Sequence, residues 1–176
     1  MDVLIAHGSA GSRRGLVQIL AGQGYEVIEV GDGPAALEAL LESDSPRLAV
    51  LDWDLPGIDG AEICRLVRRY RLAGPPYLVL LAAGRDRTEI TAGLEAGAND
   101  CLRTPVSGTE LRTRIDAGRR FVQLPWERAD RLATAGRATT AASAPVFDPS
   151  TAAAWPHRGA PEGTARRASA ATLSAR

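Results

Sequence analysis

The sequence predicts an α/β protein with a five-stranded, doubly wound parallel sheet that carries helices on both faces. Three observations support this fold class. Short apolar segments alternate with longer segments that have apolar residues at helical spacing, and five such pairs precede residue 125. The short segments are almost continuously apolar, which favours a sheet covered on both sides. Glycine or proline separates most of the segments, as is typical of turns.

The first half of this pattern starts at the N-terminus. Residues 2–6 are predicted to form a short apolar strand, and residues 12–21 a helix with apolar positions at helical spacing. Residues 25–30 form the next predicted strand, after two glycines that end the helix. Residues 34–41 form the second helix, in which Pro34 occupies the first turn, where a missing N–H is tolerated.

The central part contains the most apolar strand. Residues 48–51 are predicted to form this third strand, directly before Asp52. A turn rich in proline and glycine follows, and residues 61–70 form the third helix. Residues 77–81 form the fourth strand, after a pair of prolines that cannot continue a helix.

The last part completes the sheet. Residues 87–96 are predicted to form a helix that ends at Gly97, residues 100–102 a minimal fifth strand, and residues 109–124 the last helix. The inward-facing residues predicted for this helix are Leu111, Ile115 and Val122, with Phe121 as a further candidate.

The composition changes after the last predicted helix. From about residue 134, alanine, serine, threonine, proline and glycine dominate, and large apolar residues are too scattered to offset the cost of ordering the chain. The sequence therefore predicts a domain over residues 1–124, a short helical linker over 125–135 and a disordered tail over 136–176.

The overall composition excludes few classes of protein. The formal net charge is zero, and all 21 basic residues are arginine, so neither nucleic acid nor a membrane is an expected partner. The two cysteines, Cys64 and Cys101, are isolated and predict neither a metal site nor a disulfide. The N-terminus shows no signal peptide, and no apolar run is long enough to span a bilayer. The expected location is therefore the cytoplasm.

Asp52 is the most informative residue of the chain. It follows the third predicted strand and precedes the turn Leu55–Gly60. Open α/β sheets place their reactive groups at the carboxyl ends of parallel strands. A carboxylate at this position is therefore a candidate for chemistry.

Further segments accompany Asp52 in a fixed order. They are Val3–Ala6, Gly24–Val27, Gly31–Gly33, Leu51–Gly60, Gly93–Asp100 and the pair Glu110–Leu111 after Pro105. Together these segments resemble the receiver domain of response regulators in two-component signalling, over residues 2 to about 124. The resemblance implies a flavodoxin-like sheet with strand order 2-1-3-4-5.

The resemblance also implies a role for Asp52. In this family the aspartate accepts a phosphoryl group from a histidine kinase, and Mg²⁺ screens the repulsion between the two anionic groups. An acidic pair after the first strand normally helps to bind the metal. This chain has His7 and Gly8 at those positions. Asp52 and the backbone carbonyl of Asp54 remain as ligands, so Mg²⁺ is expected to bind only weakly.

Three further positions depart from the family pattern. The hydroxyl residue that normally ends the fourth strand is Ala82, the lysine that normally pairs with the phosphate is Thr104, and the aromatic switch residue is Cys101. Single electrostatic stabilisers in active sites are often worth about 3–4 kcal/mol, so phosphoryl transfer is expected to be slowed by orders of magnitude. With the acidic pair gone, the pKa of Asp52 is expected to lie nearer that of an ordinary aspartate than it would in an acid-rich receiver pocket.

Other residues could compensate in part. The side chain of Asp54 could add a carboxylate near the site, although an exposed loop acid is the more common role of such a residue. Arg103 could replace the lysine, but neighbouring strand residues point to opposite faces, so it is expected to point away. His7 could bind a transition metal together with Asp52, yet a lone histidine is seldom enough for such a site. Two other acids, Asp32 and Asp59, are expected to serve turns or helix caps.

The leading hypothesis is a receiver module that signals through protein contacts, with phosphorylation of Asp52 impaired or absent. The alternative is a single-domain response regulator that takes phosphate normally from a histidine kinase. The expected partners are a histidine kinase or another signalling protein. A second copy could bind through the face formed by the fourth helix, the fifth strand and the fifth helix. A third class is an enzyme regulator or a DNA-binding protein that acts through the tail. No catalytic role is expected for the chain.

Overall fold

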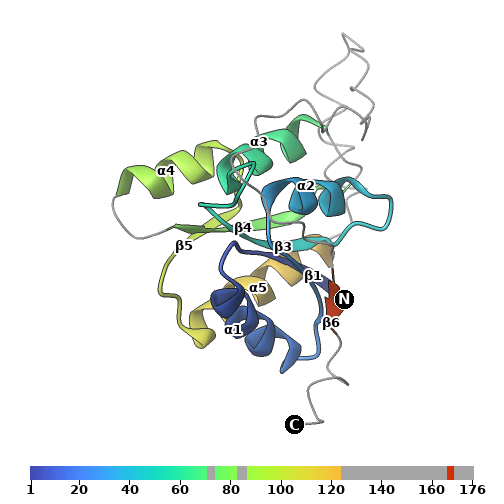
Figure 1. The fold of residues 1–176 in the computed structure, drawn as a ribbon. Helices are drawn as coiled ribbons and strands as arrows, with labels where there is room; N and C mark the ends of the chain where they lie inside the picture. The colour runs from blue at the N-terminus through green and yellow to red at the C-terminus, as the bar shows by residue number, and fades with distance from the viewer. Residues whose placement is uncertain (71–73, 83–86, 124–165, 169–176) are drawn as a thin grey trace.

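The computed structural model describes residues 1–70, 74–82, 87–123 and 166–168, without the side chains of residue 87, residue 89 and residues 166–168. In these residues a parallel sheet is covered by helices on both faces (Figure 1). The strands are β1 Asp2–Ala6, β2 Glu26–Val30, β3 Leu48–Asp52, β4 Tyr77–Ala82, β5 Asp100–Arg103 and β6 Arg166–Ala168. The helices are α1 Ala10–Ala21, α2 Gly33–Leu41, α3 Gly60–Arg69, α4 Arg87–Glu95 and α5 Gly108–Gln123.

The sheet has the strand order β5-β4-β3-β1-β2-β6. The first five strands are parallel neighbours, so the predicted order 2-1-3-4-5 is confirmed. β1 and β3 lie at the centre, and their residues from Val3 to Ala6 and from Leu48 to Leu51 are fully buried. This burial explains why the strands are almost continuously apolar in the sequence.

β6 was not expected. Arg166–Ala168 pairs antiparallel with the edge strand β2, with Glu29 opposite Arg166 and Val27 opposite Ala168. These three residues lie within the range 136–176, for which the sequence predicted disorder. The predicted linker over 125–135 and the remainder of the predicted tail lie outside the described residues.

Two apolar clusters hold the layers together. One lies between the sheet and helices α2 and α3, with Ile63, Leu80 and Leu40 among its fully buried side chains. The other lies between the opposite face of the sheet and helices α1 and α5. It contains Leu111 and Ile115, as predicted, whereas Phe121 is 37% exposed and its ring lies 5.6 Å from the ring of Tyr77.

Arg68 of α3 connects three segments around the edge of the sheet. Its Nε donates to the Gly97 carbonyl at 2.9 Å, and its terminal nitrogens donate to the Pro76 carbonyl at 3.0 Å and to Asn99 Oδ1 at 2.6 Å. The same Asn99 oxygen accepts from the N–H of Leu78 in β4. Arg68 therefore fixes the turns before β4, which is the neighbour of β3, and before β5, which lies at the edge of the sheet.

Replacing Arg68 with methionine is expected to lower the free energy of unfolding by about 2–4 kcal/mol, because three acceptors lose a charged donor. Urea denaturation at neutral pH measures the change. Arg65→Met is the matched control on the same helix. Arg65 forms one exposed pair with Glu62 at 2.9 Å, so its loss should cost about 0.5 kcal/mol or less. Similar costs for the two variants would contradict a structural role for Arg68.

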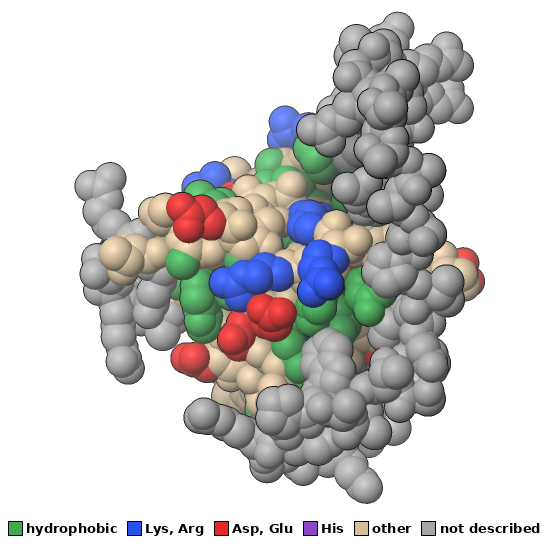
Figure 2. Space-filling model, turned by 90° about the horizontal axis from the view of Figure 1, so that it is seen from above, with side chains coloured by type: hydrophobic (Ala, Val, Ile, Leu, Met, Phe, Trp, Pro, Cys, Tyr) green, Lys and Arg blue, Asp and Glu red, His purple; other side chains and the backbone are tan. Residues whose placement is uncertain are grey.

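No helix among the described residues combines the length and the hydropathy that a membrane span requires. The face that carries α2, α3 and α4 shows arginine and acidic side chains beside one another, with hydrophobic side chains between them (Figure 2). On the part of that face formed by described residues, arginine and acidic side chains are therefore mixed.

Candidate functional site

Asp52 is the last residue of β3, at the carboxyl edge of the sheet. The next residue, Trp53, donates its N–H to the carbonyl of Leu81 in β4 at 2.9 Å and accepts from the N–H of Gly60 at 3.0 Å. These bonds fix the start of the turn that leads to α3. The carboxylate of Asp52 is 17% exposed, so it is accessible from the edge of the sheet and is not part of the core.

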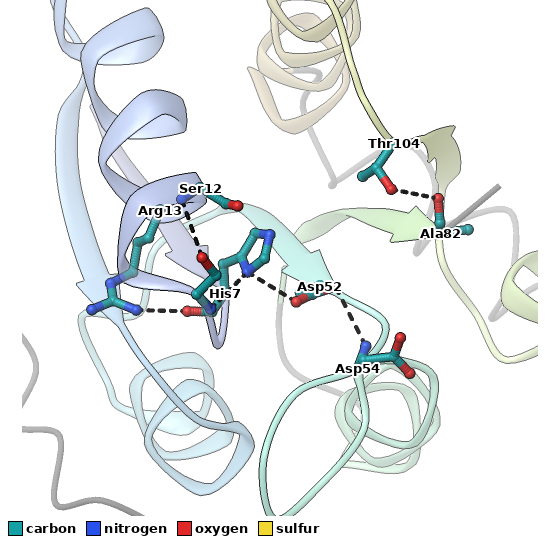
Figure 3. A network of polar contacts seen from close by, with 8 residues as sticks. His7, Ser12, Arg13, Asp52, Asp54, Ala82 and Thr104 are labelled. Atoms are coloured by element: carbon teal, nitrogen blue, oxygen red, sulfur yellow. Dashed lines mark hydrogen bonds and ion pairs between the residues drawn. The ribbon is translucent and has the colours of Figure 1, made fainter.

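His7 lies directly against this carboxylate. Its Nδ1 is 2.9 Å from Asp52 Oδ2, and both side chains are largely buried (Figure 3). His7 follows β1, the strand next to β3, so parallel pairing brings the two strand ends to the same edge. The sequence placed both residues at this edge, but it did not predict the contact between them.

The backbone of His7 is held on its other side by Arg13. Arg13 donates from a terminal nitrogen to the His7 carbonyl at 2.6 Å, and its Nε is 3.4 Å from Glu29 Oε2 in β2. The N–H of His7 donates to the carbonyl of Val30 at 3.3 Å. Contacts from α1 and β2 therefore set the position from which the imidazole reaches Asp52.

Nδ1 of His7 has two partners that compete for it. The N–H of Ser9 points to Nδ1 at 3.1 Å, and Asp52 Oδ2 lies 2.9 Å from the same atom. An unprotonated nitrogen can accept from Ser9, whereas only a protonated one can donate to a carboxylate. Because the contact with Asp52 is the shorter and involves an ionised group, we assign the proton to Nδ1.

The surroundings of Asp52 set its pKa. Burial raises the pKa of this carboxyl, but the hydrogen bond and the charge of His7, together with the N–H groups of Asp54 and Gly8, outweigh burial. The pKa of Asp52 therefore lies below its ordinary value. The sequence predicted a pKa nearer to that of an ordinary aspartate than in an acid-rich receiver pocket, and the imidazole of His7 lowers it further.

The lowered pKa predicts a dependence of stability on pH. Asp52 contributes free energy of folding that is fully present above its unfolded pKa of about 3.9 and is lost as the pH falls through the folded pKa. In His7→Asn the pKa of Asp52 should rise, and the loss of stability on the acid side should begin at a higher pH. NMR titration of the Asp52 carboxyl carbon measures the midpoint directly.

Asp54→Asn is the control for this titration. Only the backbone N–H of Asp54 contacts Asp52, at 3.4 Å from Oδ1 (Figure 3). The midpoint of Asp52 should therefore stay unchanged in this variant. An unchanged midpoint in His7→Asn as well would show that the imidazole does not influence the carboxylate.

The residues around Asp52 are a poor fit for Mg²⁺. This ion prefers six oxygen ligands in octahedral geometry. One carboxylate oxygen of Asp52 is in contact with a nitrogen of His7, and Gly8 supplies no side chain. Asp54 turns its carboxylate away from Asp52 (Figure 3). Within the described part of the chain, no three or more histidine, cysteine, aspartate or glutamate side chains are grouped so that they could hold a metal ion.

Ala82 and Thr104 bond to each other across the ends of β4 and β5. Thr104 donates its hydroxyl to the carbonyl of Ala82 at 3.2 Å and its N–H to the same oxygen at 2.8 Å. The hydroxyl therefore ties two strand ends together and does not point to Asp52. The side chain of Ala82 is buried and offers no polar atom.

Cys101 packs against the apolar cluster under α3, and burial raises the pKa of its thiol to about 11. It is therefore a neutral apolar contact at neutral pH. Arg103 is exposed, as predicted from its strand position. Asp32 and Asp59 are confirmed as N-caps: each carboxylate accepts from a backbone N–H three residues on, at 2.9 Å for Ala35 and 2.7 Å for Glu62.

A cavity of about 570 Å³ lies beside the carboxylate. Asp52, His7 and Thr104 contribute to its wall together with apolar residues of α1 and β4. No sequence pattern indicated this cavity, because it forms between segments that are distant along the chain.

Comparisons with known proteins agree with the fold. A model of the response regulator receiver domain matches residues 3–116. The DNA-binding response regulator MtrA of Mycobacterium tuberculosis is 36% identical over 115 residues, which are 65% of this chain and 49% of MtrA. The transcriptional regulatory protein AfsQ1 of Streptomyces coelicolor is 38% identical over 116 residues, which are 66% of this chain and 50% of AfsQ1. The chain therefore spans about half the length of these relatives.

Solved structures show the same fold. A crystal structure from Chloroflexus aurantiacus, described as that of a response regulator, superposes with a TM-score of 0.62 at 34% identity and covers 66% of this chain and 94% of that one. The signal receiver domain of a histidine kinase from Syntrophus aciditrophicus has a TM-score of 0.63 at 25% identity and covers 70% of this chain and 93% of that one.

Proposed function

The chain belongs to the family of response regulator receiver domains, and from this premise we propose that it signals through protein contacts, with phosphorylation of Asp52 impaired or absent. Receiver domains act as signalling modules in two-component systems. The proposal concerns the way in which this member receives and passes on its signal.

The contact between His7 and Asp52 carries the proposal. A phosphoryl group must approach a carboxylate oxygen, and Oδ2 has Nδ1 of His7 at 2.9 Å. In an ordinary receiver a divalent ion supplies positive charge both to the carboxylate and to the incoming phosphoryl oxygens. A single imidazole bonded to the carboxylate cannot serve both groups. The transition state therefore lacks charge stabilisation that is often worth about 3–4 kcal/mol for each missing group.

The output side of the site supports the same proposal. A receiver normally changes shape when a hydroxyl residue moves towards the new phosphate. Here Ala82 has no hydroxyl, and the hydroxyl of Thr104 is already bonded to the Ala82 carbonyl at 3.2 Å. Cys101 has no ring that could move between an exposed and a buried position. A phosphate on Asp52 would therefore have few groups nearby that it could draw towards itself by hydrogen bonding.

The contact between His7 and Asp52 also limits the proposed binding of Mg²⁺. We propose that the ion binds weakly, through Asp52 and the backbone carbonyl of Asp54. If it binds, it would have to compete with His7 for the carboxylate.

The proposed partners are a histidine kinase or another signalling protein, and a second copy of the chain is a further candidate. The surface proposed for these contacts is formed by α4, β5 and α5, where Leu94 is 46% exposed. We do not extend the DNA binding of MtrA to this chain, which spans about half of that protein.

A normally phosphorylated response regulator is the second candidate. One observation favours it: the Asp52 side chain is 17% exposed at the edge of the sheet, so this carboxylate, which is ionised at neutral pH, is accessible as a nucleophile. This alternative requires a metal site that differs from the family pattern.

Phosphorylation by acetyl phosphate distinguishes the two candidates. The chain is incubated with acetyl phosphate and Mg²⁺ under conditions that label an ordinary receiver, and its intact mass is measured. We expect little labelling, and no amide shifts centred on Asp52 when beryllofluoride and millimolar Mg²⁺ are added. Efficient labelling that disappears in Asp52→Asn would overturn the proposal and leave the phosphorelay alternative.

A further inference from the structure

The cavity beside Asp52 has the size and the lining of a small-molecule site. Its volume of about 570 Å³ falls in the range of about 300–1,000 Å³ that is common for such sites. Most of its wall is apolar and comes from Leu16 and Ile19 of α1, Leu81 of β4 and Val106 after β5. A site for a phosphoryl group or a hydrated metal ion needs no such apolar wall.

Polar residues also line this cavity, namely Asp52, Asp54, Ser12 and Thr104. Figure 3 shows Ser12 and His7 on the side of α1 and Thr104 on the side of β5. The wall therefore combines polar and apolar residues, and such a wall orients a ligand that has both kinds of group.

The charges in the cavity wall favour a cation. Among the described residues that line the cavity, none is an arginine, and the chain has no lysine. The acidic residues of this wall are Asp52 and Asp54. An anionic ligand would face repulsion here, whereas an ammonium group would find hydrogen-bond acceptors in the carboxylates and the hydroxyl oxygens.

We propose that this cavity binds a small organic amine, with its apolar body against Leu16, Ile19, Leu81 and Val106 and its ammonium group towards Asp52. The ammonium group would compete with His7 for Asp52. Ligand binding would therefore change the contact between His7 and Asp52 at the end of β3. This proposal does not rest on the absence of phosphorylation, because binding of an amine can be measured whether or not Asp52 accepts phosphate.

Three small probes test the chemistry of the site in the full chain by amide NMR. Phenethylamine has both the ammonium group and an apolar ring, methylammonium has only the charge, and phenylpropionate has the ring with the opposite charge. We expect saturable shifts with phenethylamine in the millimolar range, centred on Ile19, Leu81 and Val106. The other two probes should bind at least about tenfold more weakly. Equal affinity for phenethylamine and phenylpropionate would overturn the proposal, as would the absence of saturable shifts with phenethylamine.

Gly15 offers a way to block the cavity without disturbing the core. It lies on α1 in the cavity wall, and a Cβ atom at this position would meet nothing within 4 Å. Leucine also favours a helix more than glycine does, so Gly15→Leu should fold. We expect this variant to bind phenethylamine at least about tenfold more weakly, because the new side chain occupies the space of the ring. Unchanged binding in folded Gly15→Leu would show that the amine does not occupy this cavity.

Two further variants complete the test. Gln18→Leu places the same side chain on α1 outside the cavity wall, and it should bind as the unmodified chain does. Asp54→Asn keeps the size of the side chain and removes its charge, so it should weaken phenethylamine binding and leave phenylpropionate no weaker than before. An equal effect of Asp54→Asn on both probes would overturn the role of charge in the proposal.

Discussion

Labelling of Asp52 by acetyl phosphate is expected to rise roughly 100-fold or more when His7 and Gly8 become aspartate and Thr104 becomes lysine, because each restored group stabilises charge in the transition state. His7→Asp removes the nitrogen that lies 2.9 Å from Asp52 Oδ2. The two new carboxylates would add the oxygen ligands that Mg²⁺ lacks, and the lysine would add a positive charge for the phosphate.

The structure has room for a side chain at position 8. A Cβ atom on Gly8 would lie 3.3 Å from Cδ of Pro56 and 3.8 Å from the carbonyl oxygen of Asp54. The proline ring must yield by a few tenths of an ångström, and the new carboxylate would stand near the carbonyl proposed as a metal ligand. Gly8→Asp is therefore compatible with the fold.

Intact mass after incubation with acetyl phosphate measures the gain. The same triple variant with Asp52→Asn is the control for the labelled residue, and chelation of Mg²⁺ with EDTA should abolish the gain. The pair His7→Asp and Gly8→Asp without the lysine should label to an intermediate level. A folded triple variant that stays unlabelled would show that the missing charges are not what limits transfer to Asp52.

Much of the fold could be predicted from the sequence. Strands such as Leu48–Asp52 are buried on both faces, so their apolar character is continuous and easy to recognise. Capping residues such as Asp32 and Asp59 mark helix starts through a local hydrogen bond, which depends on only a few neighbouring residues. β6 could not be predicted, because three residues of ordinary composition gain their structure from a distant strand.

For the site, only the identities of the residues could be predicted from the sequence. The sequence indicated which groups the chain lacks at His7, Gly8, Ala82, Thr104 and Cys101. It did not indicate that His7 bonds to Asp52 or that Thr104 bonds to the Ala82 carbonyl, since both contacts depend on side-chain directions and on neighbours from other elements. The lowering of the Asp52 pKa by a hydrogen-bonded imidazole could not be predicted for the same reason.

Gly60 packs closely against the backbone of Asp52, so a change at this glycine affects both the site and the stability of the fold. Gly60 begins α3 and is buried. A Cβ atom at Gly60 would overlap the carbonyl oxygen of Asp52 and lie 2.6 Å from Cδ1 of Leu80. The overlapped oxygen belongs to the backbone of β3, which is paired with strands on both sides and cannot move easily.

Gly60→Ala is therefore expected to lower the free energy of unfolding by about 3 kcal/mol, at the upper end of the usual cost of overpacking. Gly15→Ala is the matched control. It makes the same chemical change in a helix, at a position where the added methyl group has open space. This second variant should be stabilised by about 0.5–1 kcal/mol, because alanine loses less backbone entropy than glycine in a helix.

The two glycine variants are predicted to have opposite signs. Urea denaturation measures both, provided that the dependence on urea concentration stays the same in each variant. In Gly60→Ala the displaced backbone should also shift the carboxyl resonance of Asp52, whereas Gly15→Ala should leave it in place. If Gly60→Ala cost no more than Gly15→Ala, the close packing of α3 against the end of β3 would be wrong. The position of Asp52 at the end of β3 would then depend only on the pairing of strands in the sheet.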